Sequence, residues 1–232
     1  MARTGFFHHI GTFLLFSATI LLIITCISAP VVHNLSLLKV DLGDSSNANT
    51  RSTVTFGTFG FCHNNVAGGG SDDCSDPHVG YSPAAVMQAI DGTDFSTYAT
   101  DTTRTLTKAM ILHPIACGID FLAFLLALGA GVLGSFLAAL VALVAFLATA
   151  VACVIDFVLF SIVRSNVNDR GQTTGANARY GPAAWTTLVA AVCSLLGAVV
   201  VFFTCCSARL HRSRTAGGKG DYAAPARRRW GW

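Results

Sequence analysis

Charged residues are scarce in this sequence. Only 12% of its 232 residues are Asp, Glu, Lys or Arg, whereas 53% are hydrophobic and the mean hydropathy is +0.58. A typical soluble domain carries about a quarter charged residues. The composition therefore excludes an ordinary soluble domain and indicates a membrane protein.

Motifs for catalysis are missing as well. The sequence has no glycine-rich phosphate loop, no metalloprotease helix motif and no nucleophile paired with a base. The adjacent Cys205 and Cys206 do not form the Cys-x-x-Cys of a thiol oxidoreductase. There is no internal repeat, which disfavours a carrier. We expect neither enzymatic activity nor a cofactor.

A long apolar stretch, residues 109–163, dominates what is present. It holds two charged residues, Asp120 and Asp156, and a glycine cluster at 129–134. One membrane-spanning helix needs about twenty apolar residues, so the stretch is long enough for two helices. The predicted parts are a span at 110–130, a short cytoplasmic turn at 131–136 and a span at 137–163.

Two further apolar runs bring the predicted spans to four, at 10–32 and 182–204. The first run has the alternative of a cleaved signal peptide, because Ser28-Ala29 resembles a cleavage site. Its length and Pro30 favour an uncleaved span. The polar segments between the spans, 33–109 and 164–181, are then predicted to be outer loops.

The tail, residues 205–232, carries the strongest basic bias in the chain. Basic residues favour the cytoplasmic side, so the tail and residues 1–9 are predicted to be cytoplasmic. The final basic cluster, Arg227–Arg229, is suited to contact with membrane lipids. It is too short to indicate a nucleic-acid partner.

The first outer loop combines a strand-like run, residues 52–62, with a glycine-rich turn that leads from Cys62 to Cys74. In an oxidising compartment these cysteines should form a disulfide worth about 3 kcal/mol, with two free thiols as the alternative. A zinc site with His63 and His78 is the sharper alternative. The close Cys-x-x-Cys spacing of such sites is absent, so we expect no metal.

Small residues recur at steps of three and four along the predicted spans, a pattern that lets helices pack closely in lipid. The second span contributes Ala116, Asp120, Ala123, Ala127, Ala130 and Gly134. The third contributes Ala138, Ala142, Ala145, Thr149, Ala152 and Asp156, and the fourth Ala183, Thr187, Ala190, Ser194 and Gly197.

Both intramembrane acids, Asp120 and Asp156, fall on these packed faces and are functional candidates by default. One interpretation is that they face each other and share a proton. The alternative is that each makes a structural contact with a serine, a threonine or an arginine such as Arg164.

Other candidates are isolated residues. Outer-face histidines could titrate near neutral pH, although solvated loop positions are the simpler interpretation. Asn34 is a formal glycosylation acceptor, and juxtamembrane Cys205 and Cys206 are palmitoylation candidates with reduced thiols as the alternative. The histidines concerned are His33, His63, His78 and His113.

Several short motifs together resemble the fungal PalI family of pH-response membrane proteins and, more loosely, the claudin pattern. The outer-loop motif consists of Phe56, Gly57, Phe59, Gly60, Phe61, Gly80 and Tyr81, with Cys62 and Cys74 beside it and His113-Pro-Ile-Ala-Cys117 at the second span. The resemblance covers about residues 10 to 206.

The resemblance implies a membrane all-α fold: a left-handed, claudin-like four-helix transmembrane bundle with a small extracellular β-sheet, in the plasma membrane. It assigns the cysteines and Phe56 to Phe61 a structural role. PalI-like proteins assist a multi-span ambient-pH sensor of the PalH-like kind. Family members commonly have a long cytoplasmic tail, whereas this sequence ends at Trp232, so we expect tail-dependent partner binding to be affected.

Three hypotheses follow. The first is a non-enzymatic accessory protein of an ambient-pH sensor complex in fungal signalling, with membrane lipids and a second copy of the chain as further partners. The second is a claudin-like structural organiser of membrane microdomains or cell-wall contact. The third is a proton-responsive transporter or channel subunit that uses Asp120 and Asp156.

Overall fold

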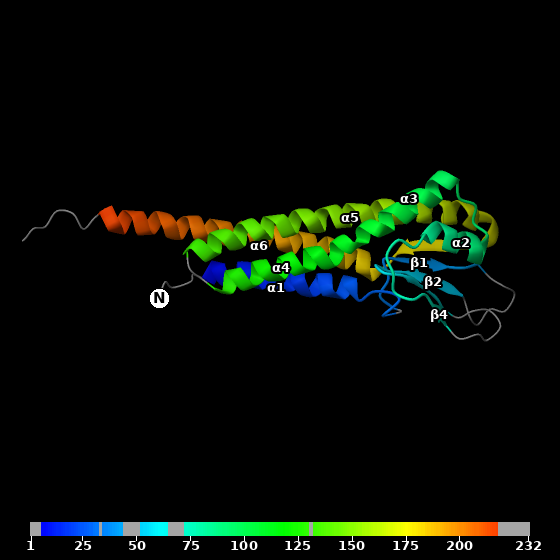
Figure 1. The fold of residues 1–232 in the computed structure, drawn as a ribbon, viewed down its shortest axis with the longest axis horizontal. Coiled ribbons are helices and arrows are strands. Elements are labelled where there is room, and N and C mark those ends of the chain that lie inside the picture. Colours follow the sequence, from blue (N-terminus) through cyan, green and yellow to red (C-terminus); the bar gives the residue numbers. More distant parts are fainter. Residues whose placement is uncertain (1–5, 33, 44–51, 65–71, 130–131, 218–232) are drawn as a thin grey trace, which may run out of the picture.

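The computed structural model describes residues 6–32, 34–43, 52–64, 72–129 and 132–217. Four helices in these ranges are long and apolar enough to cross a membrane. Figure 1 shows them side by side, with a cap of strands and short helices at one end. The protein is therefore a multi-pass membrane protein. The four helices are α1 (Phe6–Cys26), α4 (Leu112–Leu128), α5 (Val132–Thr174) and α6 (Pro182–Gly217).

The helices form a closed ring in which α1 packs on α6 and α4, and α5 packs on α4 and α6. The small-residue faces predicted from the sequence are confirmed, because they are buried along this ring. Buried members are Ala116, Ala123, Ala127, Ala138, Ala142, Ala145, Ala152, Ala183, Ala190 and Gly197. Gly134 is half-buried, and Ala130 lies outside the described residues.

Large apolar side chains cover the outside of the ring instead. Phe121, Leu147 and Val154 are each about half exposed or more. Helices leave no backbone group unpaired in a bilayer, and small residues on the inner faces allow close approach. The chain thus keeps its small side chains for helix contacts and its large ones for lipid.

The cap is built on one antiparallel sheet with the strand order β4-β3-β2-β1-β5. Its strands are β1 (Leu38–Asp41), β2 (Thr53–Phe56), β3 (Phe61–Asn64), β4 (Asp73–Cys74) and β5 (Asn177–Tyr180). The strand-like run predicted at 52–62 is β2 and the start of β3. The edge strand β5 comes from the second loop, so the two loops form a single sheet.

Two short helices complete the cap and were not predicted: α2 (Pro83–Asp91) and α3 (Thr97–Lys108). Ser82 and Ser96 cap them, each accepting a backbone N–H of the first turn. A short 3-10 turn, η1 (Ala109–Ile111), joins α3 to α4. The described residues of the first loop, 34–43, 52–64 and 72–109, therefore form a folded unit rather than a loop with one hairpin.

Several predicted boundaries were wrong. The turn predicted at 131–136 is helix from Val132, where α5 begins. The helix α1 ends at Cys26 instead of continuing to residue 32, since Pro30 disfavours helix in the residue before it. The helix α5 continues to Thr174, whereas residues 164–181 were predicted to be a polar loop. Val163 and Val167, one turn apart, are buried in the cap core and support this extension.

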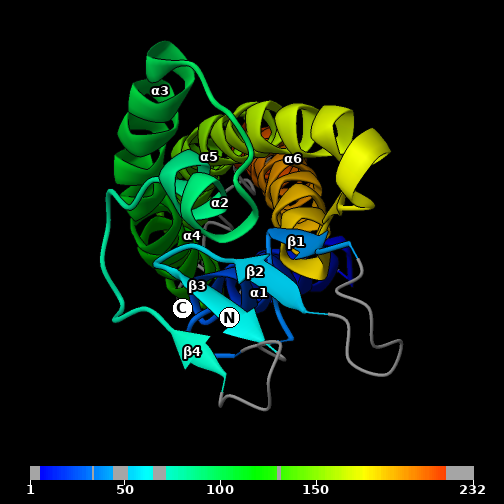
Figure 2. The same cartoon turned by 90° about the vertical axis from the view of Figure 1, so that its right-hand side faces the viewer.

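A tight turn at 57–60, between β2 and β3, fastens the sheet to the end of α1. The Thr58 amide donates to Ser28 Oγ at 3.0 Å, and its hydroxyl donates to the Thr25 carbonyl at 2.9 Å. That carbonyl lies in the last turn of α1, where acceptors lack a helical partner. Figure 2, viewed from the cap end, shows the strands lying across α1.

Glycine at position 57 is required by this seating, because a Cβ there would collide with the backbone of Ala29. We predict that Gly57→Ala lowers the free energy of unfolding by at least about 2 kcal/mol. Gly118→Ala is the matched control, since its Cβ would meet open space and alanine favours helix by about 1 kcal/mol. Unfolding in mixed detergent micelles measures the stability of both variants. Equal stabilities would contradict the close contact of the 57–60 turn with the end of α1.

Candidate functional site

The motif residues of the first loop meet at the junction between cap and bundle. Phe56, Phe61 and Tyr81 form a three-ring cluster with centroids 6.2 to 6.4 Å apart. The Tyr81 hydroxyl donates to the Gly57 carbonyl at 2.6 Å, and the Thr107 hydroxyl donates to the Tyr81 carbonyl. Burial, with the nearby negative charge of Asp156, raises the pKa of Tyr81, so its hydroxyl keeps its proton.

The remaining motif positions serve the same junction. Gly80 has φ +84, which glycine adopts without strain. Gly60 is buried and Phe59 half-buried in the turn on α1. The predicted disulfide is present: Cys62 and Cys74 are bonded and join β3 to β4. With both sulfurs bonded to each other, neither is left as a thiolate ligand for the zinc alternative.

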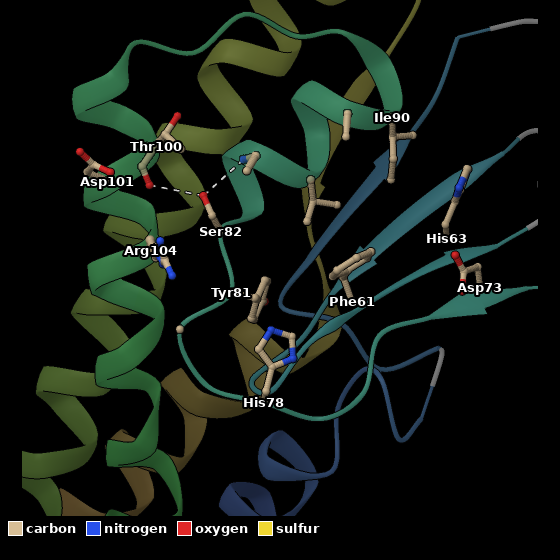
Figure 3. A pocket seen from close by; sticks show the side chains of 14 residues that line it. Phe61, His63, Asp73, His78, Tyr81, Ser82, Ile90, Thr100, Asp101 and Arg104 are labelled. Carbon is tan, nitrogen blue, oxygen red and sulfur yellow. Dashed lines mark hydrogen bonds between the residues drawn. The ribbon is translucent and has the colours of Figure 1, made fainter.

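A groove of about 660 Å³ opens beside this cluster, between the β3–β4 side of the sheet and the helices α2 and α3 (Figure 3). Its floor is apolar and its walls carry ionisable side chains. The lining residues are Phe61, His63, Asp73, His78, Gly80, Tyr81, Ser82, Ala85, Val86, Ala89, Ile90, Thr100, Asp101 and Arg104.

Two of the predicted outer-face histidines lie at this groove. His63 is half-buried on β3 opposite Asp73, and its Nε2 is 2.6 Å from Ser52 Oγ. His78 is exposed, donates from Nδ1 to the Asp76 carbonyl at 2.7 Å and meets the Tyr81 ring edge-on. His33 lies outside the described residues. Two histidines far apart in the first loop thus share one surface.

The histidine at position 113 is not a solvated loop residue, and that interpretation was wrong. It is fully buried, and its Nε2 lies 3.0 Å from Asp156 Oδ2 across the α4–α5 interface. Its Nδ1 donates to the Met110 carbonyl at 3.1 Å. One proton must therefore lie between Nε2 and the carboxyl group, and the pair as a whole is neutral. A neutral pair avoids the cost of a lone buried charge.

The two intramembrane acids do not share one partner. Asp120 accepts from Ser194 on α6 at 3.2 Å, whereas Asp156 is paired with His113. The structural alternative, a polar contact between helices, thus describes Asp120. Among the described residues, Arg164 forms an ion pair with neither acid. It donates to the Ala178 carbonyl and lies over the Tyr180 ring. Among the described residues, Asp120 Oδ2 and Asp156 Oδ1 are buried without a hydrogen bond.

Comparison with known proteins decides the family. Residues 7–197 match the sequence model of the SUR7/PalI family, from α1 through the cap and into α6. The chain belongs to the SUR7/PalI family. As a SUR7/PalI protein it has the expected fold: a claudin-like four-helix membrane bundle with a small, disulfide-containing sheet.

Two curated relatives of this SUR7/PalI chain are fungal. It is 31% identical over 115 residues to the "pH-response regulator protein palI/prr-5" of Neurospora crassa. It is 27% identical over 119 residues to the "pH-response regulator protein palI/RIM9" of Emericella nidulans. The matches cover 50% and 51% of this chain but 14% and 18% of those proteins. Both names indicate a regulatory role in the pH response.

The modification candidates of this SUR7/PalI chain have different surroundings. Asn34 is exposed in the turn after α1. On α6, Cys205 is buried and Cys206 half-buried, so Cys206 is the more accessible thiol for an acyl group. Glycosylation and palmitoylation stay predictions. Within the described ranges, no three His, Cys, Asp or Glu side chains are arranged to hold a metal ion.

The His113–Asp156 pair yields a stability prediction. We expect His113→Leu to destabilise the protein by about 2 kcal/mol, because it leaves the Asp156 carboxyl group buried without its partner. The double variant His113→Leu/Asp156→Leu should lose less free energy of unfolding than the two single variants together, with a coupling energy of at least about 1 kcal/mol. A double-mutant cycle of unfolding in mixed micelles measures this, and purely additive losses would refute it. His78→Leu, on the exposed surface, is the control.

Proposed function

We propose that this protein is a non-enzymatic accessory subunit that assists a multi-span, PalH-like ambient-pH sensor at the fungal plasma membrane. The observation that carries the proposal is family membership together with two relatives named as pH-response regulators. The chain spans less than a fifth of those relatives' length, so the partner and the assistance are part of the proposal.

The architecture supports an outward-facing cap. A disulfide such as Cys62–Cys74 forms in oxidising compartments, and the tail beyond α6 carries the densest basic residues, which favour the cytoplasm. With four spans, both chain ends lie on the same side. We therefore assign the cap to the outside and both ends to the cytoplasm.

The claudin-like fold favours one second candidate, a structural organiser of membrane microdomains or cell-wall contact. Such a role needs the cap and the lipid-facing helices but no pH-dependent partner. The transporter or channel alternative would use Asp120 and Asp156, which contact Ser194 and His113 separately, and among the described residues no contact between helices favours it over the other two candidates.

Orientation can be tested at Val79, which is 44% exposed on the cap. In a variant with Cys205 and Cys206 replaced by serine, we expect Val79→Cys to react with a membrane-impermeant maleimide on intact spheroplasts. A second variant, which keeps Val79 and Cys206 and has only Cys205 replaced by serine, should react after permeabilisation only. Labelling of Val79→Cys only after permeabilisation would place the cap in the cytosol and overturn the proposal.

The role in signalling can be tested by a chimera. In Emericella nidulans lacking its palI/RIM9 relative, a chimera would be expressed in which residues 7–197 of this chain, the part that matches the family model, replace the SUR7/PalI region of that relative. We expect growth at alkaline pH to be restored, and a multi-span membrane protein to co-purify with the tagged chimera. The same relative without the transplanted segment is the control.

The outcomes separate the candidates. Unrestored alkaline growth with normal surface levels of the chimera would refute the accessory role. If deletion in the native host left alkaline growth normal but altered membrane patches, the structural organiser would be favoured.

A further inference from the structure

We propose that the cap groove is a docking site for an extended polypeptide segment in which a large apolar side chain stands next to a carboxylate, and that it binds this segment more tightly at acidic than at alkaline pH. The inference rests on the proposed function in taking the partner to be a protein. It adds the location and the chemistry of the contact.

The floor of the groove selects for an apolar side chain. Phe61 on β3 and Val86 and Ile90 on α2 line it, and all three are only partly buried by the cap core. When a partner covers partly exposed apolar side chains in a concave site, the burial of their surface favours binding. The groove is open on one side, as an extended segment requires.

One wall supplies a cation. Arg104 on α3 is exposed, and the described structure gives its guanidinium no ion pair. Figure 3 shows its side chain directed from α3 towards Tyr81 and Ser82, whereas Asp101, one turn earlier, lies towards the outer side of the helix. A guanidinium beside an apolar floor is suited to binding a carboxylate through two parallel hydrogen bonds.

The other walls supply the pH dependence. Imidazole is the side chain whose charge ordinarily changes between about pH 5 and 8, and His63 and His78 both line the groove. Since His78 Nδ1 already donates to the Asp76 carbonyl, an added proton would go to its Nε2.

The neighbouring ionisable groups decide the sign of the effect. With neutral histidines, the lining holds one positive side chain, Arg104, and two negative ones, Asp73 and Asp101, so it has one net negative charge. With both histidines protonated it has one net positive charge. Tyr81 keeps its proton, and Lys108 lies just outside against Gly80. An acidic segment is therefore favoured in acid.

The test uses the full chain in lipid nanodiscs and a phage-displayed library of random peptides, panned at about pH 5.5. We expect enriched peptides to carry Asp or Glu beside a large apolar residue. Fluorescence anisotropy with one enriched synthetic peptide then gives affinities for the wild type and the variants. Binding should weaken about three- to tenfold for Arg104→Gln.

The matched control is Lys108→Gln, which removes a positive charge from the same helix but not from the groove lining. It should leave binding unchanged. The double variant His63→Gln/His78→Gln should bind equally at about pH 5.5 and about pH 8, whereas the wild type should bind more weakly at the higher pH. A thermal melt of each variant confirms that it is folded.

Three results would overturn the inference: enriched peptides without an acidic residue, equal losses for Arg104→Gln and Lys108→Gln, or no pH dependence in the wild type. A failure here leaves the accessory role intact if the chimera restores alkaline growth. Failure of the chimera with positive peptide binding would instead refute the accessory role and keep the groove.

Discussion

The cap keeps its position because α5 does not end at the membrane. At about 1.5 Å per residue, its 43 residues extend about 64 Å, roughly twice the apolar thickness of a bilayer. One half supplies the small-residue face of the bundle, and the other supplies Val163 and Val167 to the cap core. One continuous helix therefore belongs both to the bundle and to the cap core, and links the sheet to the spans.

Polar contacts then specify how the helices meet. In lipid, apolar side chains gain little from one another, and close packing and hydrogen bonds select the interfaces. Asp156 with His113 joins α5 to α4, and Asp120 with Ser194 joins α4 to α6. Near the cap, Thr25 meets Thr186 and Thr187, which joins α1 to α6. The first and the last of these contacts join neighbours in the ring, whereas the Asp120–Ser194 contact crosses the ring from α4 to α6.

Properties that depend on local composition could be predicted from the sequence. Hydropathy gave the four spans, the spacing of small residues gave the buried faces, and two cysteines in a polar loop gave the disulfide. Ser82-Pro83 and Gly92 are also the start and stop signals of α2, and could have revealed that helix. The threonine-rich α3 has weak helix propensity and depends on its packing against α5.

Properties that depend on distant pairing could not be predicted. The strands β1 and β5 have four residues each and lie well over a hundred residues apart, so no local pattern links Leu38 to Tyr180. The partner of Asp156 is 43 residues away on another helix. The groove likewise needs residues from β3, β4, α2 and α3 together. Its histidines were visible in the sequence, but their shared surface was not.

The late position of β5 in the chain has a consequence for biogenesis. A nascent chain can assemble the four strands β1, β2, β3 and β4 as soon as the first loop is made. The outer edge of β1 is then open and could pair with another chain. That edge stays open until two more spans have been inserted and Asn177–Tyr180 has emerged. Maturation of the cap is therefore tied to completion of the membrane domain, and an arrested intermediate would display an unfinished sheet.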